Sequence, residues 1–111
     1  MLSIILVGLL NAPLELNASD FVNGTIEAVR PDNFDVGGVF VFLSGSMSGA
    51  QTCTFPNGTS SNYYFISKNN PLMKELLAAA LSAKLSEKAV TVVGKGVCTQ
   101  GYEDVRYIEI H

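Results

Sequence analysis

The sequence predicts a mainly β fold, an OB-fold-like five-stranded Greek-key barrel with one α-helix between the third and fourth strands. Five segments are rich in β-branched and aromatic residues and are bounded by Gly, Pro, Asn or Asp, and a sixth carries apolar residues at helical spacing. One helix after the third of five strands is the layout of the OB-fold. The alternative is an α+β sheet with the helix across one face, because one sequence does not reveal how strands are ordered in space.

The first three strands precede the helix. The first is predicted over Phe21 to Pro31, where apolar and polar residues alternate and Gly24 marks a bend or bulge. The second, Val39 to Gly45, has almost no polar residue and is expected to be buried on both faces or nearly so. The Ser-, Gly-, Thr- and Asn-rich segment 46–61 predicts a long loop, or a loop with a short edge strand. The third strand is Asn62 to Lys68.

The helix is predicted over Pro71 to Ser86. Asn70 can cap the amide groups of the first turn, and Pro71 fits the first helical position because its missing N–H has no partner there. The apolar residues follow the spacing of one helix face, and we expect them to pack on the core of the same domain. They are Leu72, Met73, Leu76, Leu77, Ala80, Leu81 and Leu85.

Two strands follow the helix. The fourth runs from Ala89 to about Val97, and its glycines predict strong curvature. A turn is predicted from Thr99 to Asp104, where the neighbouring carboxylates Glu103 and Asp104 are expected to be solvated. The last strand starts at Val105 and alternates to the end of the chain.

Composition limits the classes of function. The chain has 111 residues, with 7 Lys and Arg against 10 Asp and Glu, a net charge of -3 and 48% hydrophobic residues, so it predicts one folded domain. The acidic balance argues against a nucleic-acid partner, since phosphates are neutralised by a surplus of Lys and Arg. With one histidine, two cysteines and no tryptophan, the sequence predicts no cofactor and no metal site.

The N-terminal segment 1–18 predicts an export signal. Leu2 to Leu10 is almost entirely apolar, too short to span a bilayer, and is followed by a candidate cleavage site after Ala18. No Lys or Arg precedes this run, and the alternative is a buried first strand or helix of the mature protein. The favoured interpretation predicts a secreted or periplasmic protein, a single domain over residues 19–111 and no stable membrane insertion.

The two cysteines, Cys53 and Cys98, predict a disulfide. No CxxC or Cys/His spacing suggests a metal site or a redox motif. A bond closing a loop of about 45 residues stabilises a fold by roughly 4 kcal/mol in the chain-entropy model. The alternative is a pair of buried free thiols in a cytosolic protein, where structural disulfides are rare.

Three stretches carry a resemblance over about residues 21 to 111: VFVFLSG with Cys53, NNPLMKELLAAALSAKLSEKAVTVVGKGVC, and YEDVRYIEI. Together they resemble a group of small exported bacterial proteins, and more distantly the B subunit of subtilase cytotoxin and its relatives. Those subunits are OB-folds that form pentameric rings and bind sialylated glycans. The resemblance implies a ring-forming homo-oligomer and a ligand site near the first strand, for which Ser19 and Asp20 are the candidates. This chain lacks the extra C-terminal cysteines of the cytotoxin subunit.

The residues themselves suggest binding rather than catalysis. The only histidine, His111, ends the chain, so no catalytic triad can be assembled from the sequence, and no phosphate-binding glycine motif is present. Tyr63, Tyr64 and Phe65 alternate in the third strand, which places Tyr64 on one face and the other two rings on the opposite face. Tyr63 and Tyr64 are therefore candidates for stacking on a ligand, although one of the two faces belongs to the core.

The sequence thus predicts a non-enzymatic, exported binding module for a glycan or a protein partner, similar to a toxin B subunit. The alternative is a periplasmic or secreted structural domain for protein interaction, with no small-molecule ligand. A nucleic-acid-binding OB-fold is disfavoured by the net charge of -3.

Overall fold

The computed structural model describes residues 20–45, 47–48, 53, 62–99 and 101–111. The predicted signal segment 1–18, the candidate Ser19 and most of the predicted loop 46–61 lie outside the described residues. The described elements are β1 (Asp20–Asp32), β2 (Gly38–Ser44), β3 (Met47–Ser48), β4 (Tyr63–Ser67), α2 (Met73–Ser86), β5 (Val90–Thr99) and β6 (Tyr102–Ile110). Each predicted strand and the helix are therefore present, with ends shifted by a few residues.

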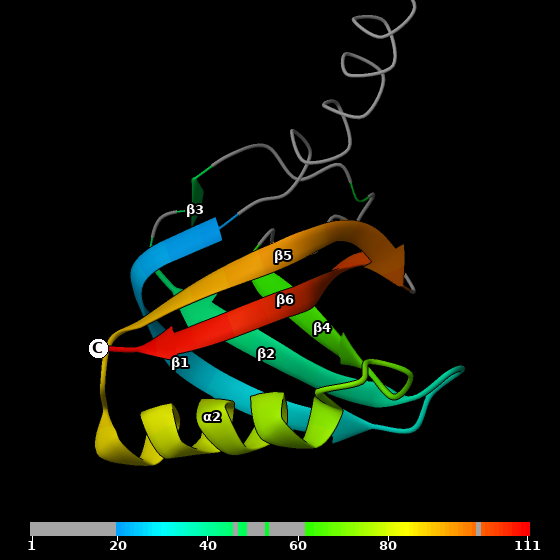
Figure 1. The fold of residues 1–111 in the computed structure, drawn as a ribbon, viewed down its shortest axis with the longest axis horizontal. Helices are drawn as coiled ribbons and strands as arrows, with labels where there is room; N and C mark the ends of the chain where they lie inside the picture. The colour runs from blue at the N-terminus through cyan, green and yellow to red at the C-terminus, as the bar shows by residue number, and fades with distance from the viewer. Residues whose placement is uncertain (1–19, 46, 49–52, 54–61, 100) are drawn as a thin grey trace, which may run out of the picture.

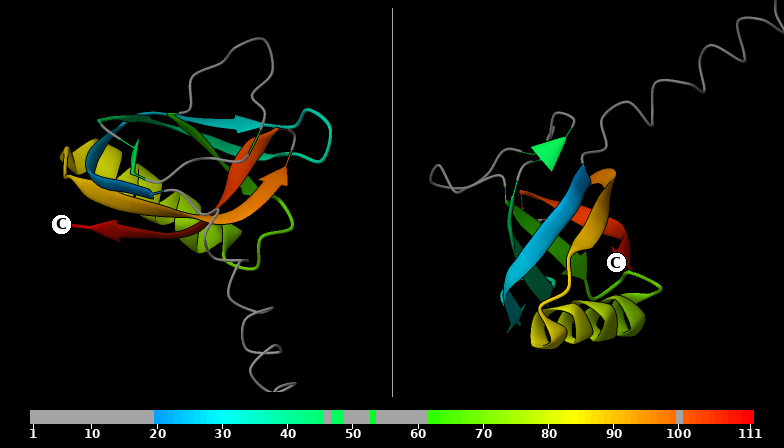
Figure 2. Two further views of the ribbon diagram at one scale, coloured as in Figure 1. Left: turned by 90° about the horizontal axis from the view of Figure 1, so that it is seen from above. Right: turned by 90° about the vertical axis from the view of Figure 1, so that its left-hand side faces the viewer.

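The five long strands close into a ring (Figures 1 and 2). β1 pairs with β2, β2 with β4, β5 with β6 and β5 with β1, all antiparallel, while β4 and β6 are parallel. The pairing of β4 with β6 closes the ring. We call it the β4–β6 seam; it is short, with Phe65 opposite Asp104. With α2 between the third and fourth long strands, this order confirms the mainly β, OB-fold-like prediction and not the sheet with a helix across one face.

The hydrophobic core lies inside the ring and is covered on one side by α2, which runs beside β1 and β6 (Figure 1). Inward-facing residues of β2 and β4 alternate with residues that face outward, as the two-residue period of a strand requires. The core residues are Ile26, Val39, Val41, Leu43, Tyr64, Ile66, Leu76, Ala80, Ala83, Val90, Val92 and Val105.

α2 begins two residues later than predicted, at Met73. The N-cap residue is Leu72 and no side chain caps the helix, so the predicted capping role of Asn70 is wrong. The Asn70 side chain instead accepts a hydrogen bond from the Leu72 N–H at 2.9 Å, in the turn that precedes the helix. Its amide nitrogen also donates to the Val105 carbonyl at 3.0 Å. Asn70 is buried and therefore ties the start of α2 to β6.

The apolar stripe of α2 is wider than the face that the helix buries. Leu76 and Ala80 belong to the core, but Leu72 and Leu81 are exposed and Leu85 is 83% exposed. The expectation that the whole stripe packs on the domain is therefore wrong. The helix face that packs on the ring consists of the buried residues Leu76, Ala80 and Ala83 with the partly buried Met73 and Leu77, and Leu81 and Leu85 lie outside it.

The predicted turn from Thr99 to Asp104 is also wrong in part. β5 continues to Thr99, which pairs with Tyr102, so β6 starts earlier and contains both carboxylates. Glu103 is 0% exposed and Asp104 is also buried. The sequence alone suggested solvated charges because it did not reveal what lies opposite them in the neighbouring strands.

Each buried carboxylate has backbone donors. The Gly96 N–H donates to Glu103 Oε2 at 2.9 Å, and a Cβ at Gly94 would overlap the Glu103 carboxylate, so the glycine makes room for it. Asp104 Oδ1 accepts from the Ser67 N–H at 3.1 Å, across the short β4–β6 seam. These bonds explain how the two acidic side chains are accommodated inside the fold.

Candidate functional site

The outward side of β2 and β4 carries a cluster of aromatic rings, to which β6 adds one more. While Val39, Val41 and Tyr64 point into the core, the alternate positions of the same strands hold aromatic residues on the opposite side. We call this cluster the aromatic surface. It consists of Phe40, Phe42, Tyr63, Phe65 and Tyr102.

Strand register brings these rings together. Phe40 lies directly opposite Phe65, and Phe42 lies opposite Tyr63, with ring centroids 4.8 Å apart in both pairs. Tyr102 meets Phe40 edge-on at 4.9 Å and lies 6.0 Å from Tyr63. Such cross-strand aromatic pairs stabilise a sheet by about 0.5–1.5 kcal/mol each beyond their buried area.

The aromatic surface has an inner part and an outer part. Phe40 and Phe65 are buried and form its base. Phe42, Tyr63 and Tyr102 are only half-buried, so each residue remains partly accessible to solvent. Two of these three side chains carry a hydroxyl group, which can donate and accept hydrogen bonds at the edge of a stacked ligand.

Arg30 of β1 lies beside the aromatic surface. It is the direct cross-strand partner of Phe40, and its guanidinium carbon lies 4.7 Å from the centroid of that ring. Its Nε is 3.5 Å from Asp32 Oδ2, with the two side chains 59% and 31% exposed. An exposed pair of this kind adds little to stability, but the ring and the carboxylate restrict where the guanidinium lies.

The two predicted tyrosines have different positions. Tyr63 belongs to the aromatic surface, whereas Tyr64 is a core residue with no exposed area. A ligand that approaches from solvent therefore meets Tyr63 and not Tyr64. Asp20 is the first residue of β1, where its backbone pairs with Val93 of β5.

The sequence reasoning missed four members of this region: Phe40, Phe42, Tyr102 and Arg30. A signal for the first two was present, because VFVF places both phenylalanines on one side of a strand. The contributions of Tyr102 and Arg30 depend on the pairing of segments far apart in the chain, which no local pattern reveals.

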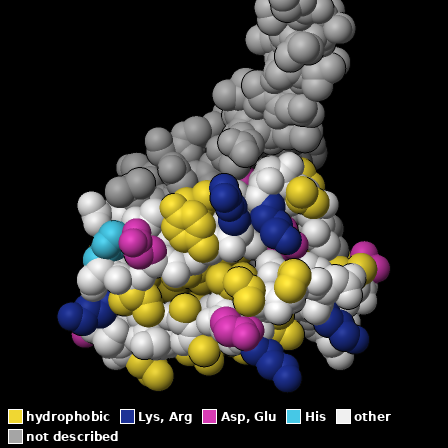
Figure 3. Space-filling view, viewed as in Figure 1, with side chains coloured by type: hydrophobic (Ala, Val, Ile, Leu, Met, Phe, Trp, Pro, Cys, Tyr) yellow, Lys and Arg dark blue, Asp and Glu magenta, His cyan; other side chains and the backbone are white. Residues whose placement is uncertain are grey.

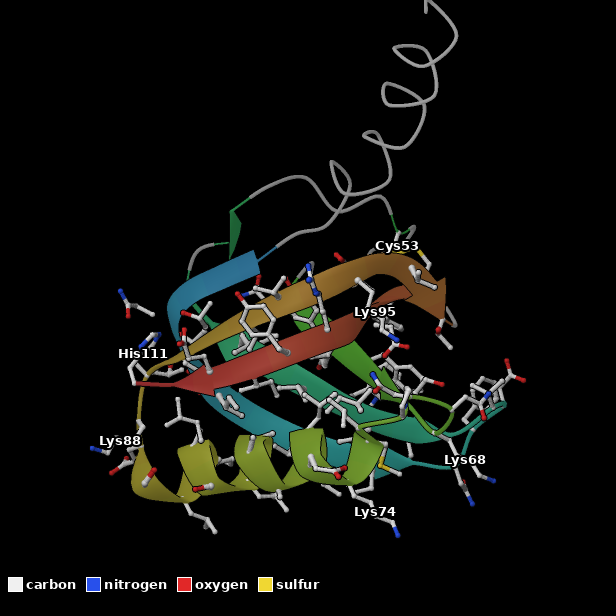
Figure 4. The ribbon with its side chains drawn as sticks, in the orientation of Figure 1. Cys53, Lys68, Lys74, Lys88, Lys95 and His111 are labelled. Atoms are coloured by element: carbon white, nitrogen blue, oxygen red, sulfur yellow. A yellow bond between two sulfur atoms is a disulfide. The ribbon has the colours of Figure 1, made fainter. Side chains whose placement is uncertain are left out.

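A disulfide joins Cys53 and Cys98, as predicted. Cys98 pairs with Glu103 near the end of β5, and the next recorded pair, Thr99 with Tyr102, leads directly to the aromatic surface. Figure 4 places Cys53 beside this end of β5. The disulfide therefore anchors the hairpin end that carries Tyr102.

The described residues offer few other candidates. They contain no group of three or more His, Cys, Asp or Glu side chains arranged to hold a metal ion. Among them, no helix is long and apolar enough to cross a membrane. A hollow of about 270 Å³ between β1 and the end of α2 has two lysines and two glutamates in its lining, so its charges balance, and it has no aromatic ring.

His111 also has a local partner. Its Nε2 lies 2.7 Å from the Thr91 hydroxyl oxygen, which links the end of the chain to β5. The aromatic surface remains the region best suited to a ligand, because it offers ring faces, hydroxyl groups and a guanidinium within a few ångströms of one another.

Comparisons with protein-family models, with curated proteins and with solved structures find no match to this chain.

Proposed function

We propose that this protein is a non-enzymatic, exported binding module that holds a carbohydrate on the aromatic surface. The observation that carries the proposal is the position of Phe42 and Tyr63 as half-buried residues on the outward side of the second and third long strands, with Tyr102 of β6 beside them. OB-folds bind oligosaccharides and oligonucleotides on this face and at the neighbouring loops. The net charge of -3 favours the oligosaccharide over the oligonucleotide, because nucleic-acid phosphates are neutralised by a surplus of Lys and Arg.

Export is supported by the Cys53–Cys98 disulfide, because structural disulfides persist in oxidising compartments and are rare in the cytosol. The resemblance of the sequence to toxin B subunits extends the proposal to a ring-forming homo-oligomer. Light scattering of the purified, oxidised protein tests that extension, and a monomer at all concentrations would contradict it.

The experiment for the carbohydrate proposal is a glycan-array screen followed by titration calorimetry with the oligosaccharides that bind. We expect Tyr63→Leu and Tyr102→Leu each to weaken binding by about tenfold, the loss that follows from removing about 1.4 kcal/mol of contact. Leucine keeps apolar volume while removing the ring and the hydroxyl. Leu85→Ala, on the exposed side of α2, is the control and should leave the affinity unchanged.

Absence of any glycan signal at high protein concentration would refute the proposal. Equal affinity of the wild type and both tyrosine variants would place the ligand elsewhere and refute the assignment of the surface. Thermal unfolding of each variant shows whether the fold is retained.

A second candidate function, docking of a protein partner without a small ligand, is favoured by Phe34 in the β1–β2 loop. This side chain is 74% exposed, yet its backbone is held in place: its N–H donates to Asp32 Oδ1 at 2.9 Å and its carbonyl accepts from the Gly37 N–H at 3.1 Å. An exposed aromatic side chain on a backbone held by hydrogen bonds is suited to anchoring an interface. Loss of partner capture in Phe34→Ser, with glycan binding absent in the wild type, would support this candidate over the first.

A further inference from the structure

The outward side of the β5–β6 hairpin carries two cations beside an exposed aromatic ring. Lys95 of β5 and Arg106 of β6 are exposed, and Tyr107 is 44% exposed. Figure 3 shows two basic groups side by side over β5 and β6, with hydrophobic groups on either side of them, and Figure 4 labels Lys95 on the same side of the molecule. We call these three residues the basic row.

The arrangement results from an irregularity in strand pairing. Val93 pairs with Tyr107 but Gly94 pairs with Val105, so Arg106 is an extra residue in β6. The bulge lets the neighbours Arg106 and Tyr107 both reach solvent, while Val105 on one side and Ile108 on the other pack against the core. Bulges re-aim side chains in this way and are common next to binding sites.

A second irregularity in the β5–β6 pairing lies around Lys95, whose side chain is exposed. The register shifts again between Gly94 and Cys98, and Gly96 has a φ of 75°, a conformation that suits glycine. The buried Glu103 carboxylate accepts a hydrogen bond from the Gly96 N–H and fills the space beside Gly94. Glu103 is thus a positioning residue, because it holds the short segment of β5 from which Lys95 projects.

The basic row is not neutralised by its own surroundings. In the part of the chain that the structure describes, the recorded ion pair is the one between Arg30 and Asp32, and neither Lys95 nor Arg106 has a carboxylate within 4.0 Å. Along β6, Glu103 and Asp104 precede Arg106 but are buried, and the exposed acidic residue of the strand is Glu109, beyond Tyr107. In a chain with a net charge of -3, two adjacent unpaired cations beside an accessible ring form a distinct surface.

We propose that the basic row binds a linear anionic polysaccharide, with Tyr107 stacked on a sugar ring and Lys95 and Arg106 paired with its anionic groups. A repeating polyanion suits a row of side chains on an open sheet, because successive charged groups can meet each cation in turn. The guanidinium binds sulfate or carboxylate oxygens in a forked geometry, and the lysine acts as a point charge. This site lies on strands other than β2 and β4, and it does not depend on the carbohydrate site proposed above.

The test uses the full oxidised chain and three probes of equal length: a sulfated heparin oligosaccharide, a carboxylated hyaluronan oligosaccharide and a neutral maltooligosaccharide. Binding is measured at low salt by titration calorimetry and by NMR chemical-shift changes. We expect one or both anionic probes to bind, with shifts confined to β5 and β6, and the neutral probe not to bind this surface. The two anionic probes distinguish sulfate from carboxylate as the recognised group.

Variants separate this surface from general electrostatic attraction. Lys95→Gln/Arg106→Gln should weaken the binding of the anionic probe by about tenfold. The matched control Lys84→Gln/Lys88→Gln removes two exposed cations at the end of α2 (Figure 4). The variants are compared at about 0.1 M salt, where the Debye length is about 10 Å and distant exposed charges are largely screened, so this control should change affinity by less than about twofold. Tyr107→Leu should weaken binding while leaving its salt dependence unchanged.

Two results would overturn the proposal: no binding of either anionic probe at low salt, or an equal loss in the α2 control. Tyr102→Leu distinguishes the two proposed sites. If that variant abolishes binding of the anionic probe, the ligand lies on the aromatic surface and the basic row is not its site. If Tyr102→Leu leaves the binding of the anionic probe intact, the basic row binds independently of the aromatic surface. Failure of the aromatic-surface proposal then does not affect the basic-row proposal.

Discussion

Removal of the Cys53–Cys98 disulfide is the perturbation with the largest expected effect on stability. The two cysteines are separated by 45 positions, and the loop between them contains β4, α2 and most of β5. In the chain-entropy model, opening a loop of this length returns enough freedom to the unfolded chain to lower the free energy of unfolding by about 4 kcal/mol. Small domains are stable by only about 5–15 kcal/mol, so the loss is a large fraction of the total.

The assay compares the oxidised wild type with Cys53→Ala/Cys98→Ala in urea and thermal unfolding. Alanine is chosen because Cys53 is buried and a serine hydroxyl there would add a separate cost. We expect the midpoint temperature to fall by on the order of 20 °C. A reductant should destabilise the wild type by a similar amount and leave the variant unchanged, since the variant has no disulfide to reduce.

A loss of less than about 1 kcal/mol in the double variant would refute this reasoning, because the entropy of a loop of this size is several times larger. Such a result would mean that the segments joined by the bond stay close together in the unfolded chain, or that the fold holds them without it.

Three further predictions concern packing and buried polar groups, each measured by chemical denaturation. Leu76→Ala should cost about 2–5 kcal/mol and Leu85→Ala less than about 0.5 kcal/mol, because one leucine is buried and the other is 83% exposed; equal costs would contradict the assignment of the helix faces. Gly94→Ala should cost about 1–3 kcal/mol by overlap with the Glu103 carboxylate, and adding Glu103→Ala should cost less than the sum of the two single changes; strict additivity would count against that contact. Asp104→Ala should cost about 1–3 kcal/mol by leaving buried N–H groups at the β4–β6 seam without an acceptor, and a neutral result would show that water replaces the carboxylate.

Local sequence patterns correctly predicted the elements of this fold. The spacing of apolar residues located α2, and the β-branched and aromatic segments located the five long strands, because side-chain periodicity depends only on the conformation of the chain itself. The cysteine pairing also followed from the sequence, since Cys53 and Cys98 are the only two in the chain.

The candidate site was predicted only in part. Tyr63 was identified from alternation within its own strand, but alternation assigns the two faces without saying which one is core, so Tyr64 was an equal candidate. The partners of Tyr63 come from β2 and β6, and Arg30 comes from β1. The register between strands, which is a property of the whole sheet, brings these residues together.

The sequence by itself determined where the chain is extended, where it is helical and which cysteines join, because each depends on local propensity or on simple counting. Only the tertiary structure decided that Glu103 is buried beside Gly94, that Arg106 and Tyr107 both face solvent at a bulge, and that Leu85 lies outside the core. In each case the environment of a side chain is set by how its element pairs with or packs against another element, and solvation, charge pairing and access to a ligand depend on that environment.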